Sequence, residues 1–94
     1  MAQYILFGDT VTHSLMSDTH KHFSRDCASL LKQMAREAKR ESVTAKGTSD
    51  ESYRLGSLMA FHSVISLLQQ QARAFEIPLA ELDLSDIDPQ GDLL

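Results

Sequence analysis

The chain has 94 residues and one cysteine, and its thirteen Asp or Glu outnumber its nine Lys or Arg, which gives a formal net charge of −4. A chain of this length forms a single domain and buries about 60–65% of the surface that its unfolded form exposes. The lone Cys27 excludes an intramolecular disulfide, and the negative charge argues against general binding to polyanions. No apolar run is long enough for a signal-peptide core or a membrane span, so we expect a soluble cytoplasmic protein with no membrane partner.

The charges are distributed unevenly along the chain. Residues 20–46 hold seven basic and three acidic side chains, whereas residues 47–94 hold two basic and eight acidic ones. The sequence therefore predicts a basic middle segment that is followed by an acidic end.

Residues 1–16 are predicted to form a short N-terminal arm. Residues that favour strands lie on both sides of Gly8-Asp9, a dipeptide suited to a type II′ turn, so one interpretation is a β-hairpin over residues 3–15. A disordered or partly helical arm is the other interpretation, because an isolated two-stranded hairpin is only marginally stable.

An amphipathic helix is predicted over residues 18–40, with Ser17 or Asp18 as its N-cap. At 100° per residue, one arc of about 100° collects its apolar side chains. These are Met16, His20, Phe23, Cys27, Leu30, Leu31, Met34 and Ala38.

A second helix is predicted over residues 50–76, after a loop at 41–49 that contains Gly47. Ile77-Pro78 ends it, because the residue before proline is pushed out of the helical region. Its broad apolar face holds Tyr53, Gly56, Ser57, Ala60, Phe61, Val64, Leu67, Leu68, Ala72 and Phe75. Two helices joined by a short loop favour an antiparallel hairpin, so the predicted fold is all-α.

Residues 77–94 form an acidic tail in which leucine and isoleucine recur. We expect Leu79–Ile87 to fold back on the hairpin and bury its apolar side chains, while Asp83, Asp86 and Asp88 stay in water. Residues 90–94 are predicted to remain mobile, as chain ends usually are.

Three of the four histidines, His13, His20 and His22, lie within ten residues and raise the question of a metal site. On a helix His20 and His22 point about 200° apart, so they cannot share a metal ion. His20 and Cys27 are about 10 Å apart along the axis, which is too far for a catalytic thiolate–imidazole pair. We therefore predict no metal, no cofactor and no catalytic residue, since the sequence also lacks G-x-S-x-G, a glycine-rich phosphate loop and H-E-x-x-H.

Five cations form a straight ridge on the first helix, on the side opposite its apolar arc. We interpret this ridge as a solvated outer face, because no aromatic residue interleaves with the cations to stack on bases. A nucleic-acid accessory protein that contacts polyanions through the ridge is the alternative. The ridge consists of Lys21, Arg25, Lys32, Arg36 and Lys39.

The second helix is apolar nearly all round between residues 53 and 65, which is unusual for a helix that faces water. Gly56 costs about 1 kcal/mol of helix stability relative to Ala, so close packing by another helix explains it best. We predict that a second copy covers this segment and completes a four-helix bundle, although the arm and tail of the same chain are an alternative cover. The predicted interface is Tyr53, Leu55, Gly56, Met59, Ala60 and His62.

These features favour a small non-catalytic protein that binds another protein. An apolar patch around Leu55, Met59 and His62 supplies the contact area, and the acidic tail steers a basic partner. An inhibitor, an immunity protein or an adaptor fits this description. An enzyme with a site at the dimer interface ranks third, behind the nucleic-acid accessory protein.

Overall fold

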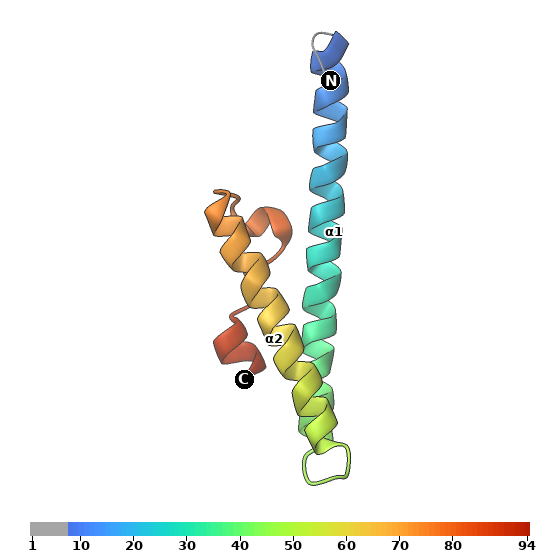
Figure 1. Cartoon of the computed structure of the whole chain (residues 1–94), viewed down its shortest axis with the longest axis vertical. Helices are drawn as coiled ribbons and strands as arrows, with labels where there is room; N and C mark the ends of the chain where they lie inside the picture. The colour runs from blue at the N-terminus through green and yellow to red at the C-terminus, as the bar shows by residue number, and fades with distance from the viewer. Residues whose placement is uncertain (1–7) are drawn as a thin grey trace.

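The computed structural model describes the backbone of residues 8–94 and the side chains of residues 18–94. Over this range the chain is all-helical, and two long helices pack against each other as a hairpin (Figure 1). Helix α1 spans Gly8–Thr44 and helix α2 spans Glu51–Ala74, followed by the 3-10 helix η1 at Leu79–Leu82 and the π-helix η2 at Pro89–Leu93. The predicted all-α hairpin is confirmed.

Helix α1 is longer at both ends than the predicted range of 18–40. Residues 8–15 are helical, so the β-hairpin interpretation is wrong for this part of the arm, while residues 3–7 lie outside the described residues. Once a helix is nucleated, each added residue gains one backbone hydrogen bond, which favours extension over a marginal hairpin. At the other end, Thr44 Oγ1 donates to the Arg40 carbonyl (3.1 Å), which keeps a β-branched residue in the last turn.

A short loop reverses the chain between α1 and α2. The Thr48 N–H donates to the Ala45 carbonyl (2.9 Å), and the Thr48 hydroxyl donates to the same oxygen (2.6 Å). Gly47 adopts a left-handed conformation with φ +81°, which a residue without Cβ tolerates at little cost. The helix on the far side begins at Glu51, close to the predicted start at residue 50.

Helix α2 ends in a pattern of hydrogen bonds that closes its last turn. The Glu76 N–H donates to the Arg73 carbonyl (3.1 Å) and the Ile77 N–H donates to the Ala72 carbonyl (2.7 Å), as in a Schellman motif. Glu76 has φ +58° at the position where glycine is usual. Pro78 follows, so the predicted end near residue 76 is confirmed to within two residues.

The tail packs against both long helices. Figure 1 shows α1 and α2 joined at the loop and diverging toward the other end, with η1 in the opening between them. The largest fully buried side chains are Ile65 of α2 and Leu84 and Leu93 of the tail. The predicted return of Leu79–Ile87 to the hairpin is therefore confirmed. Asp86 and Asp88 are exposed as predicted, but Asp83 is half-buried because it binds Lys32 and Ser29. The predicted mobility of residues 90–94 is wrong, because Leu93 is 0% exposed within the core.

Helix α1 turns an unexpected face toward the core. Its buried apolar residues are alanines, namely Ala28, Ala35 and Ala38, together with Ala45 of the loop. The apolar arc predicted from periodicity is largely outside instead, since Phe23, Cys27, Leu30 and Met34 are all exposed. Small side chains let the tail and α2 approach α1 closely, and the larger residues of the tail then fill the core.

Candidate functional site

The cationic ridge of α1 is the surface that receives the tail. Lys32 is only 4% exposed, and its Nζ donates to the Asp83 carbonyl (2.7 Å) and to Asp86 Oδ1 (2.8 Å). The same Nζ lies 3.0 Å from Asp83 Oδ1. Ser29 Oγ donates to the other Asp83 oxygen (2.8 Å). Lys32 is thus a buried cation with two carboxylates around it, which the interpretation of the ridge as a solvated outer face did not anticipate.

Other ridge cations bind the backbone of the tail. Arg25 Nη1 donates to the Ala80 carbonyl (2.9 Å), and Arg36 Nη2 donates to the Asp86 carbonyl (3.0 Å). Lys39 Nζ donates to the last carbonyl, that of Leu94 (3.2 Å). Lys21 is exposed at the far end of the ridge. Four of the five predicted polyanion contacts therefore bind an acidic segment of their own chain.

The charged groups in this cluster stabilise one another in their ionised forms. Burial by itself lowers the pKa of the Lys32 ammonium, but hydrogen bonds and charge from Asp86 and Asp83 outweigh it and hold that pKa above its ordinary value. The hydrogen bond from Lys32 lowers the pKa of both carboxyl groups, and the hydrogen bond from Ser29 lowers the pKa of Asp83 further. The cluster therefore stays fully ionised around neutral pH.

Gln69 connects the tail to α2. Its side-chain amide is buried and donates to the carbonyls of Leu84 (3.1 Å) and Ile87 (2.8 Å). A buried amide needs such partners, because an unpaired one costs about 1–3 kcal/mol. The role of Gln69 is not predictable from the sequence, because a glutamine among Gln69–Gln71 carries no local sign of burial.

The opposite side of the hairpin carries an exposed apolar surface. Phe23 (67% exposed), Leu30 (57%) and Met34 (52%) form a stripe on α1, together with exposed Cys27. At 100° per residue this stripe lies about 170° from the ridge, so it faces away from the tail.

Helix α2 also carries exposed apolar side chains, since Tyr53, Ala60 and Leu67 are exposed and point about 160–180° away from Gln69. We call these seven residues of α1 and α2 the apolar face. Large contiguous apolar patches on soluble proteins often mark interaction sites.

The residues predicted as an interface are mostly uncovered. Tyr53, Leu55, Gly56, Met59 and Ala60 are exposed, and His62 is half-buried. A Cβ placed on Gly56 would meet nothing within 4 Å, so no part of the described chain makes the close approach that this glycine permits. Of the predicted set, Tyr53 and Ala60 belong to the apolar face, while Leu55, Met59 and His62 lie nearer the side of the tail.

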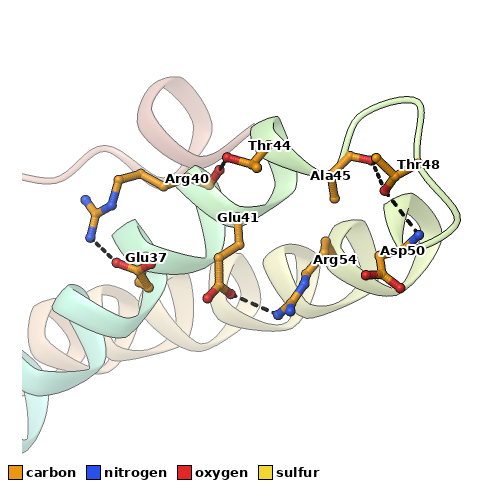
Figure 2. Close-up of a pocket in the computed structure, with 8 residues that line it drawn as sticks. All are labelled: Glu37, Arg40, Glu41, Thr44, Ala45, Thr48, Asp50 and Arg54. Atoms are coloured by element: carbon orange, nitrogen blue, oxygen red, sulfur yellow. Dashed lines mark hydrogen bonds and ion pairs between the residues drawn. The ribbon is translucent and has the colours of Figure 1, made fainter.

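A polar hollow of about 390 Å³ lies beside the loop (Figure 2). Arg40 pairs with Glu37, and Arg54 Nη1 lies 3.0 Å from Glu41 Oε1. The other lining residues are Thr44, Ala45, Thr48 and Asp50, and Thr48 Oγ1 accepts a hydrogen bond from the Asp50 N–H (3.2 Å). The two ion pairs therefore account for four of the five charged side chains that line the hollow.

The histidines lie apart from these clusters. His20 and His22 are exposed on α1, and the side chain of His13 is outside the described residues. Among the side chains that the structure describes, no group of three or more His, Cys, Asp or Glu is placed to hold a metal ion. None of the helices within residues 8–94 has the length and apolar character needed to cross a membrane.

Comparison with known proteins identified no similar protein. No protein-family model, no curated protein and no solved structure matches this chain.

Proposed function

We propose that this protein is a non-catalytic interaction protein that pairs with a second copy through its apolar face, so that two hairpins stack as a four-helix bundle. The observation that carries the proposal is the exposure of Phe23, Leu30 and Met34 on the side of α1 that the tail does not cover. In this arrangement the two tails lie on the outer sides of the bundle, and each apolar face is buried by the other.

The surface area of the chain supports this arrangement. The chain exposes 6430 Å², whereas a compact monomer of 10.5 kDa exposes about 5,400 Å². Its radius of gyration is 17.7 Å, against about 12 Å for a compact domain of this length. The single chain is therefore more extended than a compact monomer, which leaves surface that a second copy can cover.

The other candidate functions have less support from the geometry. A nucleic-acid accessory protein would need the ridge, but Arg25, Lys32, Arg36 and Lys39 bind the tail. A basic partner steered by the tail would compete with Lys32 for Asp83 and Asp86. The proposal places the protein in the cytoplasm, where an exposed thiol such as Cys27 stays reduced.

Light scattering coupled to gel filtration tests the proposal. At micromolar concentrations we expect a mass of twice the 10.5 kDa of one chain. Leu30→Asp should convert this dimer to monomer, because a charge forced into a desolvated interface costs several kcal/mol at order of magnitude. Val43→Asp is the matched control, since Val43 is also an exposed apolar residue of α1 but points about 140° away from Leu30. A monomeric mass for the unmodified chain up to about 100 μM would overturn the proposal.

A further inference from the structure

The N-terminal part of α1 extends beyond the rest of the hairpin (Figure 1). Helix α1 has 37 residues and α2 has 24, and Figure 1 shows α1 extending well beyond the end of α2. Every residue from 18 to 27 is exposed. The segment 8–24 is rich in Thr, Ser, Asp and His, which are weak helix formers, and short isolated helices are marginal in water. A helix of this kind needs a packing partner.

The spacing of the exposed residues specifies what kind of partner fits. His20, Phe23, Cys27, Leu30 and Met34 follow one another at intervals of three, four, three and four residues. This is the spacing of the seam of a coiled coil, in which side chains of one helix insert between those of another. The seam starts in the projecting part of α1 and continues into the part that packs against α2.

We infer that in the proposed dimer the two α1 helices lie antiparallel along this seam, so that the projecting end of each packs along the loop-proximal half of the other. The inference rests on the proposed function. The register that pairs Cys27 of one copy with Leu30 of the other also pairs Phe23 with Met34. His20 then faces Glu37, and both of these side chains are exposed in the single chain.

Charge favours this direction over a parallel one. After Met34 the seam continues at intervals of three and four residues to Glu37 and Glu41. In a parallel pair each of these carboxylates would face its own copy, and like charges that face each other across helices destabilise the pair. In the antiparallel pair neither carboxylate faces its own copy, and Glu37 faces the imidazole of His20 instead.

The antiparallel pair places each projecting end beside a different part of the partner helix. If the two α1 helices were parallel, both projecting ends would lie at the same end of the dimer, beyond both α2 helices. In the antiparallel pair each projecting end lies beside the segment of the partner that leads to the loop, where the polar hollow with Glu37 and Glu41 is located.

Disulfide trapping tests the direction of the helices. The background is Cys27→Ser, which removes the native thiol, and the test chain carries Phe23→Cys together with Met34→Cys. The antiparallel register places these two cysteines opposite each other between copies, so mild oxidation should give a covalent dimer at least tenfold faster than either single variant. Within one helix they are about 16 Å apart, which prevents an intramolecular disulfide.

The single variants, Phe23→Cys alone and Met34→Cys alone, are the matched controls. In the antiparallel register the introduced cysteine of either single variant would lie about 16 Å along the axis from its own copy, whereas in a parallel pair it would lie directly opposite. Rapid crosslinking of either single variant would overturn the inference. A dimeric mass without crosslinking of the double variant would also overturn it while leaving the proposed dimer intact. A monomeric unmodified chain would overturn both.

A second measurement applies if the double variant no longer dimerises. A spin label on the single Met34→Cys variant should report a distance of about 20 Å between copies if the helices are antiparallel, and about 10 Å if they are parallel. This variant keeps Phe23 and Leu30, so most of the seam remains. A distance near 10 Å would contradict the antiparallel arrangement.

Discussion

The two sides of α1 differ in a way that their side chains would not suggest, because the charged side is covered and the apolar side is exposed. The side with five cations is the one that the tail covers, and it contains Lys32, the most buried charged residue described. The side with Phe23, Leu30 and Met34 is exposed. A basic stripe on a helix can therefore be buried when the same chain supplies both the carboxylates and the leucines that cover it.

The physical reason lies in the composition of the covering segment. The tail contributes Leu84, Ile87 and Leu93 to the core and places Asp83 and Asp86 at Lys32. Burying a leucine is worth about 1.5–3 kcal/mol, whereas a buried ion pair gives little net stability. The leucines therefore drive docking, and the charges determine where on α1 the tail docks.

The largest expected effect comes from removing the tail. Truncation after Glu76 deletes Leu84, Ile87 and Leu93, and exposes Ile65. We expect the chain to lose its cooperative thermal transition, because most of the large core residues are gone. Truncation after Pro89 removes Leu93 and should lower the unfolding free energy by about 2–5 kcal/mol. Circular dichroism melts measure both, and full-length stability in either chain would show that the tail is dispensable.

Alanine substitutions of leucines on the two sides of the hairpin should differ in how much they lower the unfolding free energy. They should also differ in how that loss depends on protein concentration. Leu84→Ala should cost about 2–5 kcal/mol at any protein concentration, because it leaves a cavity in the core. Leu30→Ala should cost less than about 0.5 kcal/mol at submicromolar concentrations and more as the concentration rises, because only dimerisation buries this residue. Urea unfolding at several concentrations measures both, and a large concentration-independent loss for Leu30→Ala would place it in the core of the monomer.

Removing the buried cation should have an intermediate effect. Lys32→Met keeps the apolar stem but leaves Asp83 and Asp86 without their shared partner, so we expect a loss of about 1–3 kcal/mol. Lys21→Met, at the exposed end of the same ridge, should change the unfolding free energy by less than about 0.5 kcal/mol. Equal losses in the two variants would mean that the ridge acts only through its overall charge.

Acid should weaken the attachment of the tail by a smaller amount. The pKa values of Asp83 and Asp86 are lower in the folded chain than in the unfolded chain, so their contribution is present above about pH 4 and is lost as the pH falls through the folded values. The Lys32 pKa is raised, so its contribution is lost only above about pH 10.5. In melts from pH 7 to pH 2.5, Asp83→Asn with Asp86→Asn should lose less stability than the unmodified chain. An equal loss of stability in the double variant and the unmodified chain would contradict this expectation.

The smallest effect concerns the end of α2. Glu76→Gly should raise the unfolding free energy by about 0.5–1 kcal/mol, because glycine adopts the observed φ of +58° without the cost that a Cβ brings. Gly47→Ala, at the other left-handed position, should lower it by a similar amount. Urea unfolding measures both shifts. A destabilised Glu76→Gly chain would mean that the Glu76 side chain contributes more than its conformation costs.

The local features of this protein follow from its sequence. Apolar periodicity, Gly47 and the Ile77-Pro78 pair located two long helices and the turn between them, because helix formation and termination depend on residues within one or two turns. The leucines of the tail likewise indicated its return to the hairpin.

The side of α1 that is buried depends on tertiary contacts. Periodicity favoured the arc with Phe23 and Met34, because it measures each helix alone. The contacts that decided otherwise join Lys32 to Asp86, and Gln69 to Ile87, across separations of 54 and 18 residues. No local signal reports such pairs, since their energy arises only when the tail supplies charge and apolar surface to the same place.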